Sequence, residues 1–342
     1  MSTVRRSLMG LARMRVTQAG VDTIERILPT DRHRLTVVTY HRIGEPGENP
    51  DLYPGLLSAT PSGFADQMAY LSARRRILSA EELLAVRAGS ATLPPDSVVV
   101  TFDDAYQDFA ERAAPILRDK GVPAILFVPT DYPGGEIGFW WDRLWAALRR
   151  LPLPSGTPGD RAEILRTPSD VHRMFRRLVQ ELKSAPRQAA IDRLEGLLGQ
   201  LPDPGPCHAV VSWSQLSDLA AQDGLTIAPH SRSHPRLDHT EPELLSSEIE
   251  GSRQDLADSL GANPLPVFAY PDGGFDDRVV RAVEAAGISI AFSTRRGTND
   301  VRRIDWLRVR RINIGVQASL ALIRAQMLLP PWATGPGPRR VA

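Results

Sequence analysis

Cysteine is almost absent from this chain, which has a single one, Cys207, among 342 residues. One cysteine excludes an internal disulfide and a zinc site built from cysteine thiolates. The charges nearly cancel, with 41 Lys and Arg against 40 Asp and Glu, so the composition gives no reason to expect nucleic acid as a partner. The remaining composition, 42% hydrophobic and 24% charged, is that of an ordinary globular protein.

Long apolar runs are also missing. No stretch of about 18 apolar residues occurs, which argues against a membrane-spanning helix. Arg13 and Arg15 interrupt the apolar core that a cleaved signal peptide needs, so we expect a protein of the cytoplasm or of the inner membrane face. Residues 5–28 have the pattern of a basic amphipathic helix, which either packs on the fold or associates peripherally with a membrane. The oligomeric state is not indicated.

The most informative stretch is SVVVTFDDAYQDF, residues 97–109. It opens with a β-branched run that is typical of a buried strand. Asp103 and Asp104 stand side by side where that strand should end, and a helix pattern continues from there to Gly121. Residues 122–128 predict the next strand. Because parallel α/β folds place their chemistry at the carboxyl ends of strands, the two carboxylates are candidate site residues.

The same alternation of strands and helices recurs on both sides of this unit and predicts an α/β fold. Further strands are expected at residues 35–40, 225–228, 266–270, 288–292 and 308–314. Residues 131–212 interrupt the rhythm with a Pro/Gly/Ser linker and helical patterns, so we expect an inserted helical subdomain there. The expected divisions are an N-terminal helical segment (1–34), the main domain (35–135 and 207–328), the insert (136–206) and a disordered tail (329–342). Its aromatic run, residues 139–145, fits either helix packing or stacking on a carbohydrate.

Two histidines, His230 and His234, follow the predicted strand 225–228. At this spacing both imidazoles can reach one metal ion, whether the segment forms a helical turn or a tight loop. With one carboxylate of the Asp103–Asp104 pair they would form a three-ligand site, at which a metal lowers the pKa of water and polarises a carbonyl. The second carboxylate could then accept a proton.

Each motif alone has a simpler explanation. Histidines four residues apart are common on protein surfaces, and an aspartate after a strand often caps the following helix. The two motifs together, each placed after a strand in one βα chain, favour the catalytic interpretation.

These residues resemble the motifs of the polysaccharide deacetylases with a NodB homology domain, carbohydrate esterase family 4. TFDD at 101–104 looks like the family's TFDD motif, and HSRSH at 230–234 looks like its H-S/T-x-x-H motif. The resemblance covers roughly residues 35–130 and 209–315. It implies a distorted (β/α) barrel of about seven parallel strands, a divalent metal, usually Zn²⁺, and hydrolysis of N-acetyl groups, which are linear amides, in N-acetylhexosamine-containing polysaccharides.

The resemblance also implies a role for each matching residue. Asp103 would be the general base. Asp104, His230 and His234 would be the metal ligands. A backbone N–H near Tyr270 would help the metal to stabilise the oxyanion of the tetrahedral intermediate.

Two motifs that the family usually has are missing, an arginine before the proline in FAYPDG (268–273) and a late Leu-x-His that supplies the general acid. The chain is more similar to the exopolysaccharide deacetylases of the poly-N-acetylglucosamine type, whose domain begins with a Tyr-His-x-hydrophobic motif. YHRI at 40–43 matches that motif, and the resemblance makes His41 the candidate acid, with a buried structural histidine as the alternative. Arg311 is the candidate to replace the missing arginine in orienting Asp103.

Three functions remain open on the sequence. The leading one is a metal-dependent N-deacetylase that acts on an acetylated glycan during exopolysaccharide biosynthesis or modification. The second is an amidase of a small cyclic amide on the same barrel. The third is a catalytically impaired glycan-binding domain, which the two missing motifs suggest.

Overall fold

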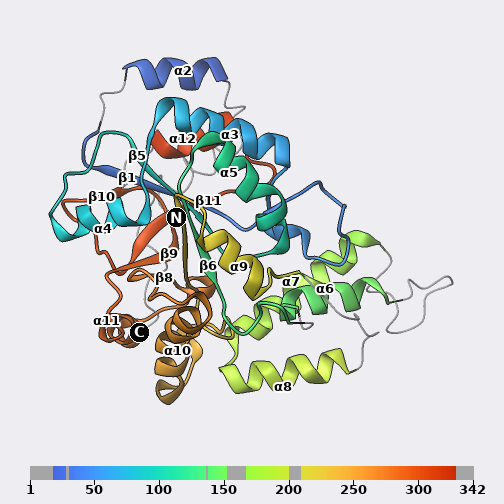
Figure 1. Cartoon of the computed structure of the whole chain (residues 1–342). Coiled ribbons are helices and arrows are strands. Elements are labelled where there is room, and N and C mark those ends of the chain that lie inside the picture. The colour runs from blue at the N-terminus through green and yellow to red at the C-terminus, as the bar shows by residue number, and fades with distance from the viewer. Residues whose placement is uncertain (1–17, 28–30, 136–137, 152–166, 200–208, 329–342) are drawn as a thin grey trace, which may run out of the picture.

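The computed structural model describes residues 18–27, 31–135, 138–151, 167–199 and 209–328 (Figure 1). At its centre is a sheet in which every neighbouring pair in the order β7-β6-β5-β1-β11-β9-β8 is parallel. The strands are β1 (Arg34–Tyr40), β5 (Ser97–Phe102), β6 (Ala124–Val128), β7 (Leu225–Pro229), β8 (Val267–Ala269), β9 (Ile290–Arg296) and β11 (Val309–Asn313).

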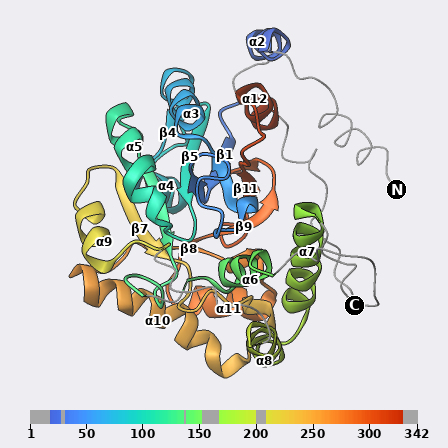
Figure 2. The ribbon, with the colours of Figure 1, turned by 90° about the vertical axis from the view of Figure 1, so that its right-hand side faces the viewer.

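The two edge strands of this sheet lie side by side, so the sheet curls into a nearly closed barrel (Figure 2). Among the described residues β7 forms a ladder with β6 and β8 with β9, but the two edges share none. The ring of His230, just after β7, crosses this seam with Nδ1 2.8 Å from the carbonyl oxygen of Ala269 in β8. The expected distorted (β/α) barrel of seven parallel strands is confirmed.

Side chains alternate between the barrel interior and the surrounding helices, as strand geometry requires. In β5, Val99 belongs to the interior cluster, whereas Val98 and Val100 belong to the cluster beneath the helices. The helices around the barrel are α3 (Pro61–Arg74), α4 (Ala80–Ala88), α5 (Ala114–Lys120), α9 (Trp213–Ala220), α10 (Pro242–Leu260), α11 (Asp277–Ala285) and α12 (Leu320–Leu328). Because β5 is buried along its whole length, a continuous β-branched run is what this position needs.

Some short elements differ from the expectation. Residues 44–60 are rich in Gly and Pro, a composition typical of a loop, but they include strand β3 (Leu57–Ala59), which pairs with β2 (Arg42–Ile43). Two more short strands, β4 (Arg76–Ile77) and β10 (Asn299–Asp300), extend the main sheet at β5 and β1. The helix after Asp104 begins with a π-helical turn at Phe109–Ala113 before α5. Strands of two or three residues carry no readable alternation, which is why the sequence does not reveal them.

Within its described residues the insert has three helices, α6 (Trp140–Arg149), α7 (Pro168–Ser184) and α8 (Arg187–Leu198), which are grouped on one side of the barrel (Figures 1 and 2). Its aromatic side chains Phe139, Trp141 and Trp145 are buried in one cluster with Phe175. Most of the aromatic run therefore serves helix packing. Residues 152–166 and 200–208 lie outside the described residues, so the extent 136–206 stays a prediction.

The N-terminal segment is described only for α2 (Gln18–Ile27), which packs on α12. Val21 is buried, and Arg324 of α12 pairs with both Asp22 and Glu25. This part of the predicted amphipathic helix packs on the fold, while the rest of it, like the tail 329–342, lies outside the described residues. Within the described ranges, none of the helices has the length and hydropathy needed to cross a bilayer.

Candidate active site

Strand alternation brings Asp103 and Arg311 together above the barrel interior. Val99 in β5 and Val309 in β11 both belong to the interior cluster, and Asp103 and Arg311 continue these two inward series. The guanidinium donates to both carboxylate oxygens, with Nη1–Oδ1 at 2.8 Å and Nη2–Oδ2 at 2.7 Å, and both residues are buried. Arg311 Nε donates to the carbonyl of Ser293 at 3.0 Å, which fixes the plane of the fork.

This ion pair sets the protonation of Asp103. Burial acts to raise the pKa of its carboxyl, but the Arg311 guanidinium and then His230 outweigh burial, and the pKa lies below its ordinary value. Asp103 is therefore a carboxylate at neutral pH.

Asp104 points toward the histidines instead. Asp104 and Ala105 both have positive φ, 73° and 51°, a conformation that is uncommon outside glycine. The surrounding chain holds this turn, since Asp103 N–H donates to Tyr40 O at 3.0 Å and Val211 N–H donates to Ala105 O at 3.0 Å. Strained backbone held in this way is frequent at functional sites.

Asp104, His230 and His234 present ligand atoms that all lie within 4.8 Å of one another, and all three residues are buried. Asp104 Oδ1 is 3.2 Å from His234 Nε2 and 3.6 Å from His230 Nε2. Even so, this carboxylate oxygen has no hydrogen-bond partner among the described residues. A buried, unpartnered carboxylate oxygen facing two imidazole nitrogens fits a divalent metal ion.

Both histidines point toward Asp104, but the two rings differ in protonation. His230 Nδ1 donates to Ala269 O, so its Nε2 is the nitrogen left for a metal. Burial lowers the pKa of His230 to about 4, so its ring is neutral at pH 7. For His234, burial acts to lower the pKa, but Asp104 outweighs it and the pKa is raised. The segment 230–234 is a tight loop, with positive φ at Ser231 and His234.

A cleft of about 410 Å³ opens above these groups. Asp103, Asp104, His230, His234 and Arg311 line it from the barrel, together with Thr39, His41, Tyr53, Trp141, Asp272, Thr294 and Asn313. Helix α7 of the insert forms another wall with Phe175, Arg176, Val179, Gln180 and Lys183. Lys183 pairs with Asp272 at 2.5 Å, which ties α7 to the barrel. His41 is only partly buried, and its N–H donates to Ser58 Oγ at 2.9 Å.

Tyr270 does not reach this cleft. Its N–H donates to Phe292 O at 3.0 Å, because β8 remains paired with β9 at this point, and its hydroxyl donates to Leu307 O at 2.9 Å. Its ring is buried and stacks on Phe275. Both polar groups of Tyr270 are thus engaged elsewhere, so the oxyanion contact expected near this residue would need another N–H. Asp272, the next residue with an N–H, lines the cleft.

Asp142, in the first turn of α6, helps to position the walls of the cleft, and the sequence analysis did not identify it. Its buried carboxylate accepts the hydroxyl of Tyr106 and the N–H of Tyr53, each at 2.6 Å, and burial raises its pKa to about 7. Tyr106 in turn accepts the indole N–H of Trp141 at 2.8 Å, and the Trp141 ring lies 4.8 Å from that of His234. One carboxylate thus positions two walls of the cleft. The only indication of this role in the sequence is that an acidic residue lies within the aromatic run 139–145.

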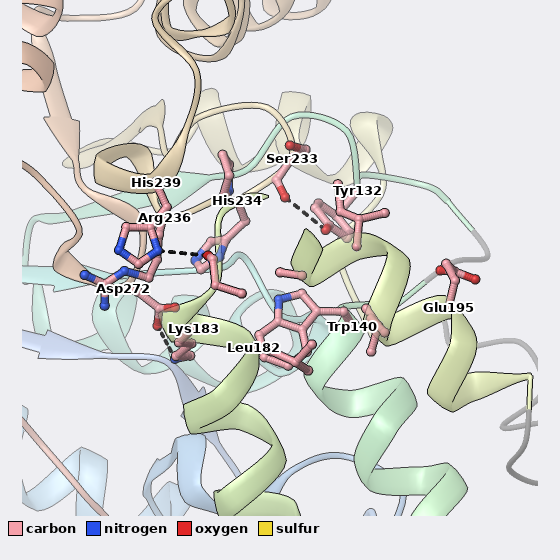
Figure 3. A pocket seen from close by; sticks show the side chains of 15 residues that line it. Tyr132, Trp140, Leu182, Lys183, Glu195, Ser233, His234, Arg236, His239 and Asp272 are labelled. Atoms are coloured by element: carbon pink, nitrogen blue, oxygen red, sulfur yellow. Dashed lines mark hydrogen bonds and ion pairs between the residues drawn. The ribbon is translucent and has the colours of Figure 1, made fainter. Parts of the chain in front are cut away.

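A second pocket, of about 270 Å³, shares His234, Lys183 and Asp272 with the cleft. Figure 3 shows the Lys183–Asp272 pair at its edge and Trp140 and Leu182 among its apolar walls. The insert and the barrel therefore meet in two adjoining cavities.

Comparison with known proteins shows which family and which solved structures this chain is similar to. A family model described as "Polysaccharide deacetylase" matches residues 90–177 and 204–291, more than half of the chain. No curated protein sequence matches the chain.

Several solved structures share the fold. The Streptococcus pyogenes deacetylase PplD, in complex with acetate, has a TM-score of 0.57 at 18% identity, over 87% of this chain and 99% of that one. IcaB from Ammonifex degensii has a TM-score of 0.57 at 17% identity, over 87% and 98%. The de-N-acetylase of Aggregatibacter actinomycetemcomitans has a TM-score of 0.56 at 16% identity, over 85% and 99%.

Proposed function

This chain belongs to the polysaccharide deacetylase family, and from that premise we propose that it uses Zn²⁺ to remove N-acetyl groups from N-acetylhexosamine units of an exopolysaccharide. Membership makes it a hydrolase of the N-acetyl amides of a glycan. The observation that carries the finer proposal is the buried Asp104–His230–His234 cluster beside the Arg311-bound carboxylate of Asp103, within one cleft.

Asp104, His230 and His234 would hold the metal. Two neutral imidazoles and one carboxylate are a donor set that suits Zn²⁺ and leaves a coordination position open. When bound, the ion lowers the pKa of water and polarises the amide carbonyl.

Asp103 would accept the proton of the attacking water. Arg311 contacts both of its oxygens, so the carboxylate keeps one orientation toward the cleft and stays ionised at neutral pH. We assign Arg311 as a positioning residue that takes the place of the arginine missing from FAYPDG. The N–H of Asp272 replaces that of Tyr270 as our candidate for the oxyanion contact.

His41 would protonate the departing sugar amine, since it lines the same cleft as Asp103. Replacement by alanine should lower kcat by about 10²–10⁴-fold, the usual contribution of a general acid, without changing the metal content. Initial rates of acetate release and metal analysis of the purified variant measure the two effects. His33→Ala, which removes an exposed histidine outside the cleft, is the matched control. A kcat for His41→Ala equal to that of the control would place the acid elsewhere.

The metal-loaded protein should release acetate from N-acetylglucosamine oligomers, and chelation should abolish that release until Zn²⁺ is restored. Enzymatic or chromatographic quantification of acetate measures it. Hydrolysis of cyclic amides alone would support the amidase alternative. Tight glycan binding with no turnover, unchanged in Asp103→Asn, would support the impaired binding domain.

A further inference from the structure

Helix α7 has two faces of opposite character. Its apolar side chains Val171, Phe175, Leu178 and Leu182 are buried in the insert cluster. Its other face lines a groove of about 570 Å³ with Ser169, His172, Arg173, Arg176, Arg177 and Gln180. These residues recur at helical spacing on one side of α7, and none of the described side chains lining the groove is a carboxylate.

This groove is continuous with the active-site cleft. Arg176 and Gln180 line both cavities, so part of a glycan that extends from the cleft along α7 reaches the arginines directly. The groove is therefore placed to contact a unit of the same substrate chain that does not react.

Arg176 lies where the groove meets the cleft, and among the described residues no carboxylate pairs with it. Arg173 pairs with Asp170 at 3.0 Å, and Arg177 pairs with Glu181 at 3.1 Å. Arg176 is exposed and forms no ion pair within the part of the chain that the structure describes. In the cleft, Arg311 and Lys183 are already matched by carboxylates.

We propose that the groove centred on Arg176 binds an anionic group of the glycan, a carboxylate or a phosphate, on a unit near the reacting N-acetylhexosamine. A guanidinium fork suits both anions because it can donate two parallel hydrogen bonds. The preferred substrate is then an acidic polysaccharide. This inference rests on the proposed function and adds the substrate's charge to it.

The test compares oligosaccharides of equal length: neutral N-acetylglucosamine oligomers, hyaluronan oligomers, which alternate N-acetylglucosamine with glucuronate, and N-acetylglucosamine oligomers that carry a phosphate. We expect a lower KM for an anionic series, and the carboxylate and phosphate arms identify the preferred anion. Arg176→Gln should reduce the ratio of neutral to anionic KM by roughly 2–5-fold, with kcat little changed, as for loss of one exposed charge-assisted contact. Arg118→Gln, an exposed arginine of α5 outside both cavities, should leave the ratio unchanged.

Equal KM values for all series in the wild type, or an equal rise for all series in Arg176→Gln, would overturn the inference while leaving the deacetylase proposal standing. If no series turned over, the deacetylase proposal would fail. Calorimetric binding of the same oligosaccharides would then still test whether the groove binds an anion. Tighter binding of an anionic series that Arg176→Gln removes supports the anion groove, and equal binding overturns it.

Discussion

Replacing Asp103 by asparagine should lower kcat for acetate release by about 10²–10⁴-fold, while the protein still binds its metal. The amide keeps the shape of the carboxylate but cannot accept a proton from water. The proposed metal ligands are other side chains, Asp104, His230 and His234, so the substitution leaves them intact. Steady-state rates of acetate release and metal analysis of the same preparation measure both outcomes.

A change in stability has to be separated from this effect. Asp103→Asn leaves the Arg311 guanidinium buried without its carboxylate, and removal of one partner of a buried ion pair typically costs about 3–5 kcal/mol. Leu83→Ala, a truncation of a fully buried core residue in α4, is expected to cost about 2–5 kcal/mol and should retain turnover. Near-normal activity in Asp103→Asn would show that the base lies elsewhere.

The second large effect is expected for His234→Ala, which should raise the Kd for Zn²⁺ by at least about 100-fold, since even indirect partners of metal ligands contribute 10–100-fold. Asp104 would keep a single imidazole opposite its unpartnered oxygen. Competition with a chromogenic chelator measures the Kd. Because His234 has a raised pKa and must lose its proton to bind metal, wild-type affinity should also weaken as the pH falls.

His239→Ala is the matched control for that measurement. His239 lies on the same connection between β7 and α10, but its Nδ1 is 3.1 Å from Ala185 O and it is not part of the ligand cluster. Its Kd for Zn²⁺ should equal that of the wild type. Unchanged metal affinity in His234→Ala would refute the ligand assignment.

The parts of the site that could be predicted are the side chains that lie at the carboxyl ends of strands. Asp104 and His230 follow buried strands whose apolar runs are plain in the sequence, and parallel strands bring their carboxyl ends to one edge. The contact between Arg311 and Asp103 follows in the same way, because β1 lies between β5 and β11 and both residues face inward.

The parts that could not be predicted depend on how separate segments dock. Helical periodicity identifies the buried face of α7, but not that its arginines border the cleft. Nothing local to Asp142 shows that it accepts hydrogen bonds from Tyr53 and Tyr106. The N–H of Tyr270 is engaged because Tyr270 still pairs with β9, and its hydroxyl donates to Leu307 O, a contact that no local pattern indicates.

Because His230 spans the open side of the barrel, an ion at the proposed site would also stabilise the contact between the two edge strands. One imidazole nitrogen fastens β7 to β8, and the other faces the ion site. An ion bound there also restrains the ring that spans the gap, and binding to the folded state alone stabilises that state. Loss of the ion should therefore speed amide hydrogen exchange along β8, and this measurement does not depend on catalytic activity.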